Sequence, residues 1–362
     1  MQSLNLYRKA ASLLVTRKRW NVAAHHQRLS MALVGSDSMI SKTTIQSHQH
    51  QRRSIVWNAH ADVRGPFGSF KEEYELSLRE PEKYWAKAAD KIEWFQKPSS
   101  ILDYDADFNP HFPKWFSDGI INMSYNCLDV HVNNGRAKQD ALMYDSPVTG
   151  VKQRFTFEEL LDQVATLAGA MQDLGIEPGD RVVIYMPMIP QAIISMLACC
   201  RIGAVHSVVF GGFAPKELAT RITDCTPKLI ITASAGIEPS HVVPYKPLLD
   251  KALELSSHKV DHSIVVQRRS VKEAELASMR PMDLDYDEIM ARSYPVNAVP
   301  LPSTHPHHIL YTSGTTGLPK GVVRDTGGYA VTLKQSMGSF YNTNPGETFW
   351  SASDIGWVVG HR

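Results

Sequence analysis

The sequence predicts an α/β fold, in which a parallel sheet flanked by helices follows a small, mainly helical N-terminal domain. Short apolar segments of strand length alternate with amphipathic helical segments after Pro147, a pattern typical of a parallel sheet. The part before them is dense in aromatic and charged residues instead. Hydrophobic residues make up 43% of the chain and charged residues 21%, which excludes disordered, collagen-like and coiled-coil chains.

The aromatic part comprises residues 70–126. Helices are expected over residues 71–96 with a break at Pro81, because a proline inside a helix removes a backbone donor. Core and inter-domain packing explains its large side chains most simply. They are Tyr74, Tyr84, Trp85, Trp94, Phe95, Trp115, Phe116 and Tyr125.

The elements after Pro147 each have a local signal. Thr156 and Glu159 form a capping box that begins a helix, and Gly175 ends it. Residues 268–304 are polar and contain prolines, so a surface excursion is expected there. The remaining predicted elements are strands over 181–186, 204–210, 228–232, 263–267 and 309–312, and helices over 191–200, 215–225 and 245–256.

Charge and cysteine content exclude further classes. The net charge of +1, from 38 basic and 37 acidic residues, gives no reason to expect a nucleic-acid partner. No apolar run approaches the ~18 residues of a membrane span. The four cysteines are too few and too irregularly spaced for a disulfide framework or a CxxC zinc site, which favours a reducing compartment.

The charge is unevenly distributed along the chain. Residues 1–53 hold nine basic side chains and one acid, a charge of +8, and residues 54–362 sum to −7 from 29 basic and 36 acidic residues. This start is rich in arginine and serine, and Leu6, Ala10 and Leu13 lie at helical spacing. Such a composition predicts a disordered mitochondrial transit peptide over 1–53 and a location in the matrix; a basic tail without targeting function is the alternative.

A ten-residue string, TSGTTGLPKG, follows the predicted strand 309–312. Its glycines allow a tight backbone whose N–H groups converge on an anion, and its hydroxyl groups and lysine add donors. The spacing does not match a Walker A loop, because Pro319 stands where the second glycine belongs. A phosphate-binding loop is therefore predicted. Its residues are Thr312, Ser313, Gly314, Thr315, Thr316, Gly317 and Lys320.

This string resembles the phosphate-loop signature of the adenylate-forming superfamily. Residues 182–222 and the end of the chain, WSASDIGWVVGH, resemble short-chain acyl-CoA synthetases of the acetate and propionate type, above all the mitochondrial ones. Residues 70–126 resemble the N-terminal extension of that subgroup, which disfavours luciferase-like or peptide-synthetase activity. The resemblance implies a transit peptide over 1–53, an N-terminal domain over 70–126 and an incomplete AMP-dependent ligase domain over 127–362.

The resemblance also implies the reaction and its small-molecule partners. A short-chain carboxylate is ligated to CoA through an acyl-adenylate, using ATP and Mg²⁺ and releasing AMP and pyrophosphate. The phosphate loop would hold the β- and γ-phosphates, and Trp357, Val358 and Val359 would border the acyl group; ordinary core packing is the alternative for Trp357. Acetate-type enzymes have Thr where this chain has Val359, which favours propionate over acetate.

The implied CoA-binding residues depart from the family pattern. Glu238, Pro239, Ser240 and His241 stand where acetate-type enzymes carry an Arg-x-x-Arg segment, and a glutamate repels CoA phosphates. Val359 is a further expected CoA contact. Arg221 is a second candidate, although an arginine on the helix surface is the simpler interpretation.

The histidines give no metal signal along the sequence. His305, His307 and His308 precede the predicted strand 309–312, and no cysteine or acid stands at metal-ligand spacing from them. We therefore expect them to lie in a loop or at the start of a strand, and we expect no metal site. His361 is left open.

The family pattern continues beyond the residues of this chain. The adenylation lysine of the family is absent from these 362 residues, so no catalytic residue is assigned. We expect a truncated chain that does not complete the reaction alone, because positioning groups and charge stabilisation dominate such chemistry. The alternative is a non-catalytic truncated isoform with residual nucleotide binding.

Overall fold

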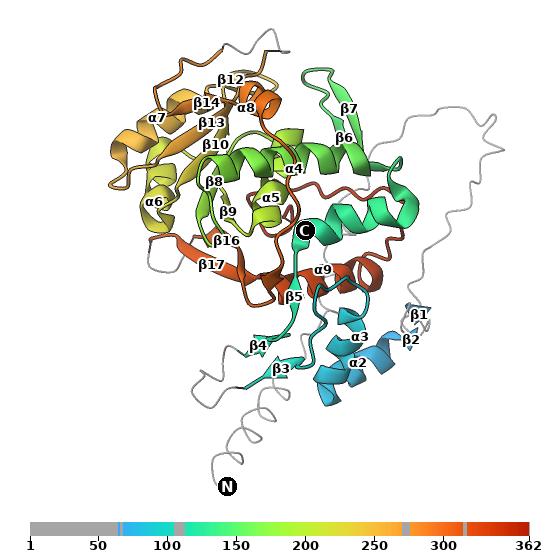
Figure 1. Cartoon of the computed structure of the whole chain (residues 1–362). Helices are drawn as coiled ribbons and strands as arrows, with labels where there is room; N and C mark the ends of the chain where they lie inside the picture. Colours follow the sequence, from blue (N-terminus) through green and yellow to red (C-terminus); the bar gives the residue numbers. More distant parts are fainter. Residues whose placement is uncertain (1–63, 66–67, 105–112, 270–275, 314–316, 362) are drawn as a thin grey trace, which may run out of the picture. The chain divides into compact units, whose positions relative to one another are not determined.

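The computed structural model describes residues 64–65, 68–104, 113–269, 276–313 and 317–361 (Figure 1). The chain divides into two units, Met1–His60 and Ala61–Arg362, and the description concerns the second. The predicted transit peptide over 1–53 lies outside the described residues.

A seven-stranded sheet forms the centre of this unit, with the strand order β14-β13-β10-β8-β9-β16-β17. All neighbouring strands are parallel except β16 and β17, which form an antiparallel hairpin. The parallel sheet is therefore confirmed, and the hairpin strand β17 was not predicted. The bounds are β8 Arg181–Tyr185, β9 Val205–Val208, β10 Leu229–Ala233, β13 His262–Val266, β14 Asp283–Asp285, β16 Pro306–Thr312 and β17 Lys320–Asp325.

Helices pack on both faces of the sheet (Figure 1). Alternate strand residues point to opposite faces, so Val182 and Ile184 lie in one core with α4 and α5. Val183 and Tyr185 lie in the other core, with α6 and α7. These helices are α4 Phe157–Asp173, α5 Pro190–Ile202, α6 Pro215–Cys225 and α7 Tyr245–Leu255.

The capping box at the start of α4 is confirmed. The Glu159 N–H donates to the Thr156 hydroxyl at 3.3 Å, and the Thr156 N–H donates to a Glu159 carboxylate oxygen at 2.8 Å. After the helix Gly175 has φ +76°, a left-handed conformation that glycine adopts without strain.

The predicted surface excursion over 268–304 is wrong in part. Asp283 lies in β14, which adds a strand to the sheet edge beside β13, and the following helix α8, Tyr286–Arg292, packs against α4. The polar composition gave no indication of this strand. In the fold, the buried Asp283 carboxylate is neutralised by Lys246 at 2.7 Å and accepts a hydrogen bond from the Ser263 hydroxyl at 2.5 Å.

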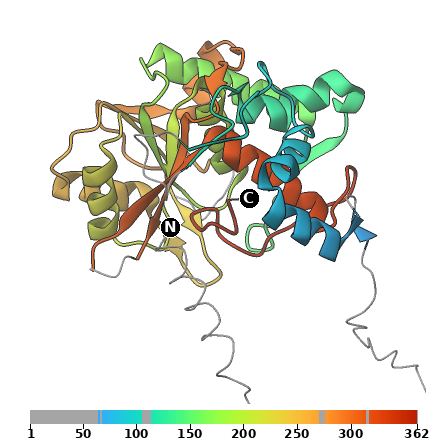
Figure 2. The same cartoon turned by 90° about the horizontal axis from the view of Figure 1, so that it is seen from below.

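The aromatic segment packs on helix α9, Thr326–Ser339. Helices α2, Phe70–Arg79, and α3, Pro81–Ala89, meet at the predicted break, but residues 91–96 are not helical. Figures 1 and 2 show α3, in blue, beside α9, in red. Trp85, Trp115 and Phe116 share a core with Val331 of α9. The packing prediction is confirmed for this core, whereas Tyr74 and Phe95 are exposed.

Short paired strands and turns lie before, within and after the aromatic segment. They are the paired strands β1 Arg64–Gly65 and β2 Gly68–Ser69, β3 Leu102–Asp103 and β4 Lys114–Trp115, β5 Ile120–Ile121 and β15 Leu301–Pro302, and β6 Asp140–Asp145 and β7 Lys152–Thr156, with the π-helical turns η2 Tyr125–Asp129 and η3 Val132–Arg136.

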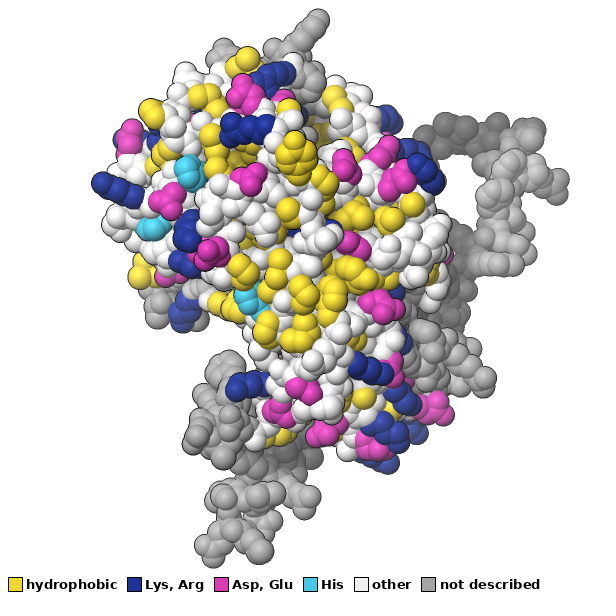
Figure 3. All heavy atoms as spheres, in the orientation of Figure 1, with side chains coloured by type: hydrophobic (Ala, Val, Ile, Leu, Met, Phe, Trp, Pro, Cys, Tyr) yellow, Lys and Arg dark blue, Asp and Glu magenta, His cyan; other side chains and the backbone are white. Residues whose placement is uncertain are grey.

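Two general features of the described residues complete the fold. None of their helices combines the length and the apolar character that crossing a membrane requires. The four cysteines are free thiols. On the face drawn in Figure 3, basic and acidic side chains are interspersed, so neither sign of charge dominates that face.

Candidate functional site

A cavity of about 570 Å³ opens where the parallel strands end. The chain leaves β8 to form β9 on one side and later forms β10 on the other side, so the strand order reverses at β8. Ligands of open α/β sheets bind at such a switch point, outside the carboxyl ends of the strands. The lining includes Pro187, Met188, Ile189, Phe210, Gly211, Gly212, Phe213, Glu238, His241, Tyr245, Arg268 and Asp354.

Gly211 and Gly212 let the loop after β9 approach its neighbours closely. A Cβ atom built on Gly211 would lie 1.8 Å from the Tyr245 hydroxyl oxygen, and one on Gly212 would lie 2.4 Å from the Phe210 ring. Any larger residue at Gly211 would therefore displace Tyr245 and reshape the cavity wall.

Two ionisable side chains of opposite sign line the cavity. Burial raises the pKa of the Asp354 carboxyl, and the Gly356 N–H donates to this carboxylate at 2.7 Å. Burial also lowers the pKa of Arg268, whose guanidinium donates to the Ala235 carbonyl oxygen at 3.3 Å. Arg268 is the one lysine or arginine among the described lining residues. Neither residue was assigned from the sequence, because Arg268 belongs to no recognisable motif and only Trp357, Val358 and Val359 were singled out in the string WSASDIGWVVGH, which contains Asp354.

The expected CoA residues Glu238, Pro239, Ser240 and His241 form the tip between two short strands, β11 Gly236–Ile237 and β12 Val242–Val243. The Glu238 N–H donates to the His241 carbonyl oxygen at 2.9 Å. The structure places Glu238 and His241 in the cavity wall, while Pro239 and Ser240 are exposed and outside the lining.

Of the expected acyl residues, Trp357 lies beside the cavity wall. The Trp357 ring lies 6.0 Å from the Phe210 ring, which lines the cavity. Trp357 is 47% exposed and Val359 is 52% exposed, so ordinary core packing is wrong for Trp357 in this structure. Val358 is exposed beside them.

The predicted phosphate loop connects β16 to β17. Thr312 pairs with Lys320 across the hairpin, and Gly317 has φ +85°. Gly314, Thr315 and Thr316 lie outside the described residues. Since β9 and β16 are parallel, this loop and the Phe210–Gly212 loop leave the sheet at the same edge.

Arg221 is not a surface residue, contrary to the sequence interpretation. It is 5% exposed, and its guanidinium lies 4.2 Å from the centre of the Phe213 ring and 5.5 Å from that of Tyr311. Its Nη1 atom donates to the Glu217 carbonyl oxygen at 2.7 Å. Arg221 thus packs the loop after β9 against β16 and does not reach the cavity lining.

The expected positions of the histidines are confirmed, because His305 precedes β16 and His307 and His308 lie at its start. His307 and His308 lie within β16 and are buried, and burial lowers the pKa of His307 to about 3. The fold brings Cys200, His206 and His361 close to them. Among the described residues, these side chains form two groups, each with three ligand atoms close enough together to hold a metal ion. This cluster was not predicted, because its five side chains come from four separate segments. His305 instead hydrogen-bonds the Gly203 carbonyl oxygen at 2.7 Å.

Two family models match the chain. The model of AMP-binding enzymes matches residues 131–362, and the model of the acetyl-coenzyme A synthetase N-terminus matches residues 70–127.

Known proteins are similar over most of this chain. The chain is 50% identical over 299 residues to acyl-CoA synthetase short-chain family member 3, mitochondrial, of Homo sapiens, covering 82% of this chain and 43% of that protein. It is 44% identical over 296 residues to propionate–CoA ligase of Escherichia coli, covering 81% and 46%. The chain thus spans about half the length of these curated relatives.

A solved structure has the same fold. Acetoacetyl-CoA synthetase from Streptomyces lividans superposes with a TM-score of 0.71 at 23% identity, covering 83% of this chain and 45% of that one. At this identity the likeness shows the fold alone, and the fold is that of the N-terminal part of the adenylate-forming enzymes.

Proposed function

Because this chain belongs to the family of AMP-binding enzymes, we propose that it forms the substrate-binding part of a ligase that joins a short-chain carboxylate to CoA. The reaction uses ATP, passes through an acyl-adenylate and releases AMP and pyrophosphate. The observation that carries the proposal is the cavity at the switch point, which has Glu238 and His241 in its wall and the Phe210–Trp357 contact at its side. In this proposal the CoA and acyl groups occupy one site.

The phosphate loop supplies donors at the edge of this site. Thr312, Ser313, Gly314, Thr315, Thr316, Gly317 and Lys320 hold the β- and γ-phosphates in this proposal, since backbone N–H groups, hydroxyls and an ammonium stabilise anionic oxygens. The hydroxyl oxygens of Thr312 and Ser313 suit Mg²⁺, which prefers oxygen ligands. When bound, Mg²⁺ shares the negative charge of the phosphates.

The acyl site is apolar in this proposal. Trp357, Val358 and Val359 exclude water from the alkyl group of the substrate, and the missing hydroxyl at Val359 favours propionate over acetate. One methylene changes discrimination by only ~1–3 kcal/mol, so Val359→Thr should move the preference toward acetate by about tenfold. Adenylation rates with each acid separately would measure this shift.

CoA binding meets an unfavourable charge at Glu238. Arg268 is the cavity cation that opposes it, and we place the CoA phosphates nearer to Arg268 than to Glu238. Pro239, Ser240 and Val359 are further proposed contacts. Glu238→Gln removes a like charge, so CoA should bind a few-fold more tightly in calorimetric titration.

Glu254→Gln is the matched control for the CoA titration, because Glu254 is an exposed carboxylate on α7, paired with Lys251. If CoA affinity changed equally in both variants, or did not change in Glu238→Gln, the proposal that CoA binds in this cavity would be contradicted. The test of the reaction itself is ATP–pyrophosphate exchange with propionate. That these 362 residues do not complete the reaction alone stays a prediction, which exchange by the purified chain would contradict.

Mitochondrial location is part of the proposal. The name of the similar human protein includes that location. We place this chain in the matrix, with residues 1–53 as the transit peptide. Import into isolated mitochondria with cleavage near Arg52 would support this, and an uncleaved chain outside the organelle would contradict it.

A further inference from the structure

A cluster of metal-ligand side chains lies inside the fold, outside the cavity lining. Cys200 lies near the end of α5, His206 lies in β9, His307 and His308 lie in β16, and His361 follows the Trp357 segment. Each is at most 6% exposed. None of them contributes to the proposed ligation, and among the described residues no acidic side chain acts on the four imidazoles.

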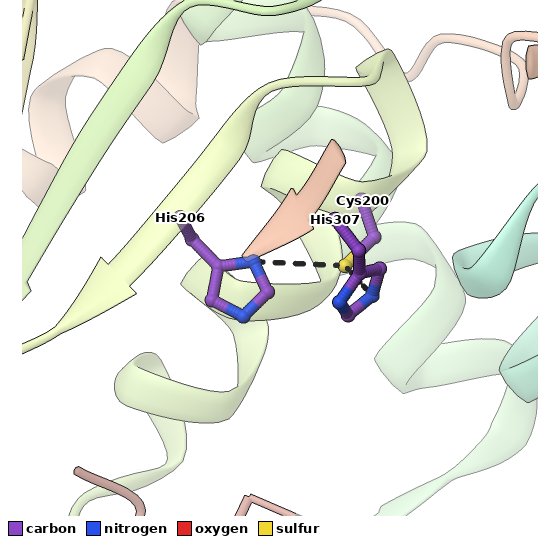
Figure 4. A group of neighbouring side chains, drawn as sticks. All are labelled: Cys200, His206 and His307. Atoms are coloured by element: carbon purple, nitrogen blue, oxygen red, sulfur yellow. Dashed lines mark hydrogen bonds between the residues drawn. The ribbon is translucent and has the colours of Figure 1, made fainter. Parts of the chain in front are cut away.

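The ligand atoms of three of these side chains lie close enough together to bind one metal ion (Figure 4). The Cys200 Sγ atom lies 3.1 Å from His307 Nε2 and 3.9 Å from His206 Nδ1. Zinc binds thiolate sulfur at ≈ 2.3 Å and imidazole nitrogen at ≈ 2.0–2.1 Å, which separates sulfur and nitrogen ligands by about 3.5 Å in a tetrahedral site. The two observed distances lie on either side of this value, so shifts of about half an ångström would accommodate an ion.

The hydrogen bonds around His206 fix which of its nitrogens is free. His361 Nδ1 lies 2.8 Å from the Ile355 carbonyl oxygen, so this nitrogen carries the proton and His361 Nε2 is an acceptor. His206 Nε2, at 2.9 Å from that acceptor, must donate. The lone pair of His206 is therefore on Nδ1, the nitrogen that faces Cys200.

A hydrogen bond to His308 likewise limits the position of the proton on His307. Its Nδ1 atom lies 2.6 Å from His308 Nδ1, so one of the two nitrogens donates. If His307 donates, its lone pair is on Nε2, facing Cys200, and the His308 proton is on Nε2, which has no partner among the described residues. His206 and His307 then each donate the N–H of the nitrogen that does not face Cys200 to a neighbouring imidazole, as metal-bound histidines usually donate theirs to an acceptor.

A bulge in β16 makes this arrangement possible. The register against β17 shifts between Pro306 and His308. In a regular strand, His307 and His308 would point to opposite faces of the sheet. The extra residue re-aims a side chain, so both neighbouring histidines reach the ring of His206, at centroid distances of 5.1 and 5.6 Å.

We propose that Cys200, His206 and His307 bind a transition-metal ion, and that the ion is Zn²⁺. Two imidazoles and one thiolate are a borderline-soft donor set that suits zinc, and a dry, buried site disfavours hard cations such as Mg²⁺. On binding, the Cys200 thiol loses its proton to solvent and forms the metal–sulfur bond, while the two neutral histidines give nitrogen lone pairs. His361 and His308 orient these rings.

The ion would connect three elements, of which β16 is distant in sequence from the other two. Helix α5, strand β9 and strand β16 each supply one ligand. Strand β9 leads into the Phe210–Gly212 loop and β16 leads into the phosphate loop, so the site holds the other ends of the strands that carry the proposed substrate site. Binding to the native state stabilises it as the ratio of free ion to dissociation constant rises.

Metal content and cobalt spectroscopy test the proposal on the unmutated protein. Protein purified without chelator should retain about one zinc per chain by mass spectrometry. After zinc removal, added Co²⁺ should produce a thiolate-to-cobalt charge-transfer band, which reports the bond between Cys200 and the ion. Retention of copper in place of zinc, or no cobalt spectrum in folded protein, would overturn it.

Adjacent cysteines offer a matched pair of variants. Cys199 and Cys200 are both buried on α5, but Cys199 belongs to the main core and contacts no cluster nitrogen at hydrogen-bond distance. Cys200→Ala should lose the charge-transfer band and at least tenfold in zinc affinity, as removing a zinc ligand does. Cys199→Ala should keep both. Circular dichroism identifies folded variants, and equal zinc affinity in the two would contradict the site.

His307→Gln provides a second variant that leaves the thiol in place. It should weaken cobalt binding while the charge-transfer band persists at high Co²⁺ concentration. Cobalt binding unchanged by His307→Gln would show that the cluster is a hydrogen-bonded network with no metal function.

Discussion

The two ends of strands β9 and β16 differ in the kind of site they carry. At their carboxyl ends lie the cavity and the predicted phosphate loop, which are made by loops and open to solvent. Near their amino ends lies the histidine–cysteine cluster, made by side chains inside the sheet and shielded from water. Ligand sites on loops tolerate variation because the strands beneath them stay fixed. The cluster lies where a bound ion could hold the two strands in place.

The two sites also differ in how their charges are managed. In the cavity, Arg268 and Asp354 remain ionisable groups with pKa values shifted by burial. In the cluster, burial lowers the pKa of each histidine and raises that of the Cys200 thiol, so the metal-free form is neutral. The cavity therefore suits charged ligands in water, and the cluster suits an ion that brings its own charge.

Gly211→Ala should give the largest effect on the cavity. The added Cβ would overlap Tyr245, and relieving this overlap should lower the free energy of unfolding by about 1–3 kcal/mol and abolish ligand binding at the cavity. Urea unfolding and calorimetry measure the two effects. Zinc binding near the amino end of β9 should persist. If zinc binding were lost together with ligand binding, the two sites would not be independent.

A control for Gly211→Ala separates crowding from backbone conformation. Gly150 has φ +68° and no atom within 4 Å of a built Cβ, so Gly150→Ala should cost only the left-handed penalty of ~1–2 kcal/mol and leave ligand binding intact. Loss of ligand binding in this variant would contradict the assignment of crowding at Gly211.

Arg268→Ala should give an intermediate effect. Removing the one described cation of the cavity lining should weaken the binding of CoA or ATP by about tenfold, because hydrogen bonds to charged groups contribute ~1.5–3 kcal/mol. Titration calorimetry at low and high salt measures it, and the difference should shrink at high salt. Lys251→Ala, an exposed site on α7, is the control and should bind as the unmutated chain does.

His131→Asn should have the smallest effect on the two sites, and it gives a baseline for acid stability outside both of them. Burial first, then Arg136 and Lys334, lower the pKa of His131 to about 4. The unfolded chain therefore takes up this proton below the ordinary histidine value of 6.5 while the folded chain does not, so stability present above that value is lost as the pH falls toward 4.

The size of this acid effect is bounded. One proton changes the free energy of unfolding by at most ~1.4 kcal/mol per pH unit. Urea unfolding between pH 7 and pH 4 should show a shallower loss for His131→Asn than for the unmutated chain. Equal slopes would assign the acid sensitivity to other groups, and would weaken the use of His131 as a baseline.

The sequence predicted elements well where local signals agreed with the fold. The capping box at Thr156 and Glu159 and the proline at Pro81 act within one turn of helix, so their effects did not depend on distant contacts. Strand β14 and helix α8 were missed because Asp283 is a charged residue and does not suggest a buried strand. Its charge is neutralised only in the fold, where Lys246 pairs with it. Strand β17 was missed because its residues are exposed and pair only with β16.

The candidate site was predicted in pieces. Glu238 and His241 were reached through family resemblance, and the structure places both in the cavity wall. Arg268 follows the end of β13 and belongs to no motif, whereas Asp354 lies after α9 in the string WSASDIGWVVGH, from which only the acyl residues were assigned, so the packing of the fold reveals both in the cavity wall. Arg221 was misplaced, because its burial depends on the rings of Phe213 and Tyr311 from two other segments.

By itself, the sequence determined the fold class, the alternation of strands and helices and the phosphate-loop motif, since each is written in contiguous residues. Tertiary structure alone decided that Cys200, His206 and His307 meet, since their contact requires α5, β9 and β16 to pack and β16 to bulge. The physical reason is that backbone propensity and periodicity act between near neighbours in sequence, whereas coordination and cavity formation depend on distances through space.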